Sequence, residues 1–373
     1  MTSEARATGG LGPARERAPL RRSQWGRRPP ERASYHDDRS GMADGAVYAA
    51  LDLGTNNCRL LVARPTDDSF RVVDAFSRII RLGEGLSHTG RISEAAIERA
   101  VGALTVCRDK MRARGVSRAR LIATEACRVA ENGETFRGRI AEEVGLDLEV
   151  VDRETEALLA ATGCAPLVAP EADGVILFDI GGGSSELVRL GRTVSNESGP
   201  VSAEIKAWTS IPVGVVTLAE RFGGVVVTTA AYDAMVQEVA GHVAPFARAN
   251  GSGNLDRIHL LGTSGTVTTI AGVHLRLPRY DRRRVDGTWL SGHQISDVVE
   301  RLLAMGYEDR VANPCIGAER ADLVLAGCAI LEAIRRAFPC KRLRVADRGL
   351  REGMLVQMMR EDRVWDRSCG ETP

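Results

Sequence analysis

From Ala46 onward, hydrophobic positions follow two periods that alternate along the chain. Short apolar runs such as "VYAALDL" and "GVILFDI" are typical of strands buried on both faces. Segments with apolar residues at helical spacing lie between such runs, and the clearest of them follows Ser93 as N-cap and stops at Gly115. Strands and helices in alternation predict an α/β fold.

The other predicted elements repeat this order. Strand–turn–strand segments are expected at 46–65 and 173–191, strand-to-helix segments at 118–132, 147–163, 256–275 and 341–359, and helices at 230–249 and 319–338.

The two strand–turn–strand segments share one pattern. In "LDLGTNNCRLLV" and "FDIGGGSSELV" a buried strand leads to Asp, an apolar residue, Gly, small polar residues and a returning strand. Asp52 and Asp179 lie 127 residues apart, about one domain length. We therefore expect two similar domains, at 46–168 and 169–362, whose glycine hairpins face each other across a central cleft.

The segments outside these domains differ in composition. Residues 1–45 are rich in Arg, Pro and Gly and lack apolar periodicity, which predicts a disordered tail, with Met42 as an alternative start. Residues 363–373 are expected to form a short C-terminal tail, and residues 192–208 a hairpin insert.

The second hairpin has the residues of an anion site. Gly181, Gly182 and Gly183 have no Cβ, so their main-chain N–H groups can approach a ligand closely, and Ser184 adds a hydroxyl donor. The carboxylate of Asp179 beside them suits Mg²⁺. The alternative for a single loop of this kind is a plain glycine turn. The recurrence of the Asp-x-Gly pattern favours a site.

Three further positions are candidates. In "LLGTSGTVTTIAGV" a strand ends at Gly262, and Thr263, Ser264, Gly265 and Thr266 lead into a helix N-terminus. Such an end attracts phosphate, but Thr and Ser can also serve only as its cap. Arg128 follows a strand and could grip phosphate, although most arginines are simply on the surface. Glu156 begins a helix after a strand, where it either orients a water as general base or only complements the helix dipole.

Composition narrows the function classes. The chain has 373 residues, 44% of them hydrophobic, and a net charge of +1, which gives no general reason to expect nucleic acid as a partner. No apolar run is long enough to cross a membrane. Eight cysteines without a Cys-x-x-Cys pair argue against a zinc site or a disulfide scaffold and favour the cytoplasm. The Walker and dinucleotide glycine motifs are both missing.

The motifs, taken together, resemble one family. From about Ala46 to Arg360 the chain resembles the Ppx/GppA family of exopolyphosphatases and guanosine pentaphosphate phosphohydrolases. The motifs that carry the resemblance are "AALDLGTNNCRLLVARP", "ATEACRVAEN", "DRETEALLAATG", "FDIGGGSSELV", "IPVGVVTLAERF", "LLGTSGTVTTIAGV" and "GLREGMLVQM". The resemblance implies two ribonuclease-H-like domains of the actin-like ATPase superfamily around a phosphate-binding cleft. It also implies a hydrolase that releases terminal phosphate from inorganic polyphosphate, guanosine pentaphosphate or both.

Site roles follow from the same resemblance. Asp52 and Asp179 match the aspartates that hold Mg²⁺, and Glu156 matches the catalytic glutamate. The phosphate-binding positions are matched by Gly54, Thr55, Asn56, Arg128, Gly181, Gly182, Gly183, Ser184 and Arg320.

Two departures from the family limit these expectations. The family commonly has Ser-Gly-x-Glu-Glu-Ala before the base, where this chain has Asp152-Arg153-Glu154-Thr155-Glu156-Ala157. The C-terminal helical domain of larger members, which helps to bind long polyphosphate and to form dimers, does not follow "LREGMLVQMM", so processivity and a homodimer stay open. An actin-like kinase that uses ATP and a sensor that binds polyphosphate or an alarmone (guanosine penta- or tetraphosphate) without turnover are the alternative functions.

Overall fold

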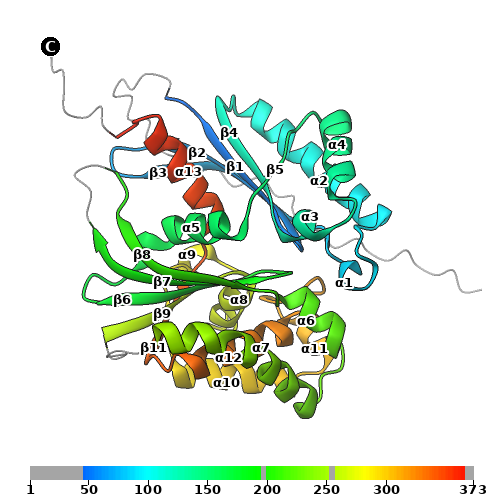
Figure 1. The fold of residues 1–373 in the computed structure, drawn as a ribbon, viewed down its shortest axis with the longest axis vertical. Coiled ribbons are helices and arrows are strands. Elements are labelled where there is room, and N and C mark those ends of the chain that lie inside the picture. Colours follow the sequence, from blue (N-terminus) through cyan, green and yellow to red (C-terminus); the bar gives the residue numbers. More distant parts are fainter. Residues whose placement is uncertain (1–44, 195–198, 252–256, 366–373) are drawn as a thin grey trace, which may run out of the picture. The chain divides into compact units, whose positions relative to one another are not determined.

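Two β-sheets carry the predicted alternation of strands and helices (Figure 1). The structure is a computed structural model and describes residues 45–194, 199–251 and 257–365. The expected N-terminal tail, apart from residue 45, therefore lies outside the described residues. Both sheets mix parallel and antiparallel pairs, so the predicted α/β class is confirmed.

The strands fall into two groups along the chain. The first sheet has the order β3-β2-β1-β4-β5 and contains β1 (Tyr48–Leu53), β2 (Asn57–Pro65), β3 (Phe70–Ile79), β4 (Arg118–Ala123) and β5 (Glu149–Val150). The second has the order β10-β11-β9-β6-β7-β8 and contains β6 (Gly174–Ile180), β7 (Ser185–Val194), β8 (Ser202–Ile211), β9 (Ile258–Thr263), β10 (Trp289–Ser291) and β11 (Arg342–Ala346).

The helices of the described residues are α1 (Leu86–Thr89), α2 (Glu94–Ala113), α3 (Glu125–Val129), α4 (Gly133–Val144), α5 (Arg153–Cys164), the 3-10 turn η1 (Ala165–Leu167), α6 (Val215–Phe222), α7 (Thr229–Asn250), α8 (Gly265–His274), α9 (Arg282–Val285), α10 (Gly292–Ala304), α11 (Tyr307–Ala312), α12 (Val324–Ala337) and α13 (Leu350–Glu361). Ser93 caps α2 as predicted, since its hydroxyl accepts from the Ala96 N–H. Helix α12 begins five residues later than the predicted 319, after Gly317 takes a positive φ of 75°.

Apart from the antiparallel edge strand β10, the two sheets share one topology. In each, three antiparallel strands (β1–β3 and β6–β8) are extended by parallel strands (β4 and β5, or β9 and β11) on the far side of the first strand. The 192–208 stretch supplies the ends of β7 and β8, which pair antiparallel as a hairpin; its residues 195–198 lie outside the description. The internal repeat predicted from the two glycine hairpins therefore extends to whole sheets.

Alternation along β1 and β6 decides where the two aspartates point. Successive strand residues face opposite sides of a sheet. In β1, Leu51 and Leu53 join the core beneath α2, while Ala50 joins the core beneath α13, so Asp52 lies on the α13 side. In β6, Leu177 joins the core on the α5 side, and so does Asp179 by the same period.

Helices α5 and α13 form the layer between the sheets. Helix α13 packs on β1 and β2, α5 packs on β7 and β8, and the two helices pack on each other (Figure 1). Their contact is very close at two glycines. A Cβ on Gly353 would lie 1.9 Å from the carbonyl oxygen of Leu159, and one on Gly163 would lie 2.1 Å from that of Gly349. Only a residue without a side chain fits at either position.

The C-terminal part of the chain differs from expectation. Helix α13 was expected with the second domain, but it lies on the first sheet. Residues 363–365 were expected in a tail, yet Trp365 is buried and its indole N–H donates to the Thr66 carbonyl at 2.9 Å. An apolar side chain that reaches the core is held there by burial, whatever its distance from the chain end. The expected domain boundary at 168/169 stays a prediction.

The glycine crossing makes a testable prediction. We expect Gly353→Ala to lower the free energy of unfolding by about 1–3 kcal/mol, because the added Cβ overpacks against backbone that cannot move aside. Gly102→Ala, inside α2 where nothing lies within 4 Å of an added Cβ, should instead stabilise by up to about 1 kcal/mol. Urea denaturation of both variants measures this, and equal effects would contradict the close crossing.

Candidate active site

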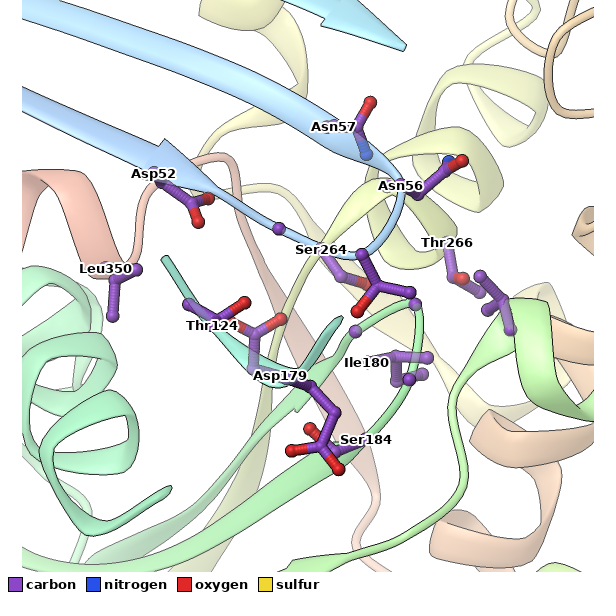
Figure 2. A pocket seen from close by; sticks show the side chains of 18 of the residues that line it. Asp52, Asn56, Asn57, Thr124, Asp179, Ile180, Ser184, Ser264, Thr266 and Leu350 are labelled. Atoms are coloured by element: carbon purple, nitrogen blue, oxygen red, sulfur yellow. The ribbon is translucent and has the colours of Figure 1, made fainter. Parts of the chain in front are cut away.

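A cavity of about 140 Å³ lies where the two glycine hairpins meet. Asp52, Asp179 and Ser264, which come from three different strands or strand ends, surround it (Figure 2). The sequence-predicted site residues that line it are Asp52, Gly54, Thr55, Asn56, Glu156, Asp179, Gly181, Gly182, Gly183, Ser184 and Arg320. Arg128 is not among the lining residues.

The first hairpin turns its carbonyl groups away from the cavity. The carbonyl oxygen of Thr55 accepts from the Gly83 N–H at 2.8 Å, and that of Asn56 accepts from the Ile80 N–H at 2.9 Å. The N–H groups of Thr55 and Asn56 donate to no acceptor within the described part of the chain. The Oδ1 atom of Asn56 is also buried without a partner there.

The second hairpin repeats this arrangement. The carbonyl oxygens of Gly181 and Gly182 accept from Val215 and Val216 at the start of α6, at 3.0 and 2.9 Å. Among the residues described, nothing accepts from the N–H groups of Gly182 and Gly183. Successive main-chain N–H groups without acceptors form an anion-binding concavity. The repeat therefore supplies two such concavities to one cavity.

The two hairpins are in direct contact. A Cβ on Gly182 would lie 2.8 Å from the Cβ of Thr55, and one on Gly183 would lie 3.1 Å from its hydroxyl oxygen. The absence of side chains at 182 and 183 is thus what lets the second loop approach the first.

The third predicted anion position also reaches the cavity. Ser264 has a positive φ of 113°, which is strained for any residue except glycine, and its Oγ is buried without a partner in the described chain. It precedes Gly265, the first residue of α8, whose free N–H groups favour an anion. An orphaned buried hydroxyl beside a helix N-terminus fits a ligand oxygen.

The two aspartates are half-buried carboxylates, and no partner is recorded for either within the described residues. Burial raises the pKa of Asp52, and it raises the pKa of Asp179 to about 6, while the positive charge of Arg59 opposes both shifts. Neither side chain makes a hydrogen bond or ion pair within the described residues. Two carboxylates in one cavity are the protein ligands that Mg²⁺ typically takes, with waters and substrate phosphates completing its shell. The donor set fits such an ion, although the described chain has no group of three or more His, Cys, Asp or Glu side chains that could hold a metal alone.

Strand register identifies two site residues that the sequence analysis did not select. Asp52 pairs with Arg59 across β1 and β2, and Asp179 pairs with Glu186 across β6 and β7. Directly paired strand residues lie on one face, so both partners line the cavity. They also correspond under the 127-residue repeat, which was the signal that could have found them. Burial, followed by repulsion from Asp179, raises the pKa of Glu186.

Glu156 stands in the first turn of α5 with one cationic partner. Arg128 donates to its Oε2 at 2.7 Å. Burial, followed by the charge of Glu186, raises the pKa of Glu156 to about 8, in spite of Arg128. Arg128 contacts Glu125 as well and also donates to the Val151 carbonyl. The predicted contact between Arg128 and phosphate stays a prediction.

Arg320 is a half-buried cation facing α8. Its guanidinium carbon would lie 3.7 Å from a Cβ on Gly265, and burial lowers its pKa. Within the described chain it forms no ion pair, so its charge is available to an anion in the cavity.

The sheets are also joined away from α5 and α13. Arg81, which follows β3, donates to both carboxylate oxygens of Asp322 before α12, at 2.9 and 3.1 Å. Beside it, the Gly85 N–H donates to Glu220 of α6 at 2.8 Å, and the Ser87 hydroxyl donates to the same carboxylate.

Known proteins resemble this chain in sequence and in fold. A sequence profile described as the Ppx/GppA phosphatase family matches residues 61–362. The chain belongs to the Ppx/GppA phosphatase family. A family member from Aquifex aeolicus, known from its crystal structure, is 28% identical with a TM-score of 0.70, over 85% of this chain and 98% of that one. An exopolyphosphatase from Cytophaga hutchinsonii is 25% identical with a TM-score of 0.76, over 84% and 98% of the two chains. The predicted fold is thereby confirmed.

Curated relatives of this family are longer than the matched region. A guanosine-5'-triphosphate,3'-diphosphate pyrophosphatase from Aeromonas hydrophila is 27% identical over 322 residues, which are 85% of this chain and 60% of that protein. The chain thus spans about 60% of the length of the first relatives of this kind. No helix in the described part of this Ppx/GppA chain has the length and hydropathy needed to cross a membrane.

The buried carboxylates give a pH-dependent prediction. A group whose pKa rises from 4.5 to about 8 on folding takes up a proton, so its unfavourable effect grows between these pH values and is complete above about 8. In the absence of metal, Glu156→Gln should therefore raise the melting temperature at pH 8.5 by an amount of the order of 2–4 °C, and should change it little at pH 4.5.

The control is Glu154→Gln, an exposed acid in the same helical turn. It should leave the melting curves unchanged at both pH values. A loss of stability in Glu156→Gln at pH 8.5 would contradict the raised pKa.

Proposed function

We propose that the chain is a Mg²⁺-dependent phosphoanhydride hydrolase that releases terminal phosphate from inorganic polyphosphate, guanosine pentaphosphate or both. The observation that carries the proposal is the cavity in which two loops with unpaired N–H groups meet two unpartnered carboxylates and Glu156. Family membership and the names of the relatives support it.

The loops bind the phosphate groups. We assign the contacts with phosphate oxygens to Gly54, Thr55, Asn56, Gly181, Gly182, Gly183, Ser184 and Arg320, which line the cavity. Arg128, which contacts the lining residues Glu125 and Glu156, is assigned the same role. Main-chain donors and guanidinium groups that line a cavity stabilise the charge on the equatorial oxygens of a transferring phosphoryl group. Because both loops are fixed by hydrogen bonds from neighbouring segments, these donors need no reorganisation when the charge develops.

Asp52 and Asp179 would hold Mg²⁺. When bound, the ion neutralises phosphate oxygens and orients the leaving group. A cation held by these two residues would also offset the repulsion by which Asp52 raises the pKa of Asp179 and of Glu156.

Glu156 acts on the attacking water. The water oxygen forms a bond to the terminal phosphorus, the bridging P–O bond breaks, and the shortened chain leaves with the bonding electrons. Glu156 orients the water and accepts its proton, a role that contributes roughly 10²–10⁴-fold to the rate. The Arg128 contact opposes the burial that raises its pKa and so favours the ionised form that a base needs.

A phosphate-release assay tests the function and separates it from the alternatives. With Mg²⁺, we expect phosphate release from polyphosphate or guanosine pentaphosphate without any acceptor. Glu156→Gln should keep substrate binding and lose turnover by about 10²–10⁴-fold, whereas Glu154→Gln should turn over normally. Release that requires a sugar or acid acceptor would indicate a kinase, and tight binding without release a sensor.

Metal dependence is tested at Asp179. Chelation should abolish turnover, and Asp179→Asn should abolish the increase in melting temperature that Mg²⁺ gives the wild type, because one of two ligands is lost. Asp147→Asn, an exposed change of the same type, should keep that increase. A full Mg²⁺ response in Asp179→Asn would remove this residue from the metal site.

A further inference from the structure

Glu125 is a buried carboxylate that the proposed mechanism does not use. It is the first residue of α3, it lines the cavity, and it is 8% exposed. A Cβ on Gly183 would lie 3.0 Å from its Cγ, so the side chain rests directly against the second phosphate loop. A negative charge at this place opposes the binding of anions.

Two arginines occupy both oxygens of this carboxylate. Arg153 donates to Oε1 at 2.6 Å and to Oε2 at 3.3 Å. Arg128 donates to Oε2 through Nε at 3.1 Å and also through its terminal nitrogen. Burial alone would raise the pKa of Glu125, but these hydrogen bonds lower it, so the group stays ionised.

Arg128 in turn has all of its guanidinium nitrogens engaged. Besides Glu125 it contacts Glu156 at 2.7 Å and the Val151 carbonyl. To bind a phosphate it must give up a partner. Glu125 is the partner that can be released most easily, since Arg153 still pairs with it, whereas Glu156 has Arg128 as its only cationic contact among the described side chains.

We propose that Glu125 is a positioning residue that takes the place of a substrate phosphate on Arg128, and that Arg153 keeps Glu125 paired when Arg128 turns to the substrate. The proposal rests on the proposed function and deepens it. An incoming phosphate exchanges with a carboxylate rather than meeting a free cation. A chain of several phosphates, held also by both loops, displaces Glu125 readily, whereas a single inorganic phosphate does so poorly. The exchange therefore discriminates for polyanions and speeds the release of the product.

The first test compares Glu125→Gln with the wild type in the presence of Mg²⁺. We expect the KM for tripolyphosphate to fall about threefold to tenfold and inhibition by inorganic phosphate to tighten by at least as much, with no rise in kcat. The control is Glu154→Gln. It removes the same charge from an exposed residue in the same turn of α5 as Glu156, and Glu154 does not contact Arg128. It should leave KM, kcat and the inhibition constant for phosphate unchanged.

Arg153→Gln should have the opposite effect. Glu125 then has Arg128 as its only cation, so phosphate competes less well and the KM should rise about threefold. The double variant should behave as Glu125→Gln alone does, because Arg153 acts only through Glu125.

A binding readout keeps this test separate from the function. The increase in melting temperature with inorganic phosphate gives an affinity without turnover and reports that each variant is folded. Tighter phosphate binding by Glu125→Gln supports the exchange even if no phosphoanhydride is hydrolysed, which would refute the proposed function alone. Unchanged or weaker phosphate binding, with wild-type turnover intact, would overturn the exchange and leave Glu125 a structural ion pair.

Discussion

The close crossing of α5 and α13 is the constraint on which the arrangement depends. Gly163 and Gly353 bring the backbones of the two helices into contact. Helix α13 packs on the first sheet and α5 on the second. The thickness of this layer sets how far β1 lies from β6. Since the period of each strand already turns its aspartate toward the layer, the crossing brings the two carboxylates to one cavity. A bulkier residue at either glycine would separate the two halves of the site without touching them.

Charge in the cavity is arranged against the stability of the empty protein. Glu186 is buried, Asp52, Asp179 and Glu156 are half-buried in the same cavity, and desolvation raises the pKa of each. Their neighbours Arg59 and Arg128 offset part of this cost, and a bound cation would offset more. Sites that bind charged ligands often keep such uncompensated groups. A site complementary to the ligand destabilises the protein when the ligand is not bound. The unpaired N–H groups of the two loops follow the same principle, but they are complementary to a negatively charged ligand.

The sequence predicted those elements and site residues whose pattern lies within one short segment of the chain. Alternation and the repeated Asp-x-Gly pattern predicted β1, β6 and both loops. The same repeat makes Arg59 correspond to Glu186, since each lies seven residues after its aspartate. The sequence was insufficient where two distant segments meet. Arg128 of α3 and Arg153 of α5 both contact Glu125, a meeting that no spacing along the chain reveals. Helix α13 is buried on nearly all sides, so its pattern did not say which sheet it covers.

The position of α13 has a consequence for the order in which the protein is made. Strands β1 to β4 leave the ribosome early, but the helix that covers their inner face follows about 300 residues after β1. At roughly 5–20 residues per second, that interval is about 15–60 s. During it, apolar side chains such as Tyr48 and Ala50 have no native cover. The first half of the molecule is therefore a natural client for chaperones until Glu361 has been synthesised.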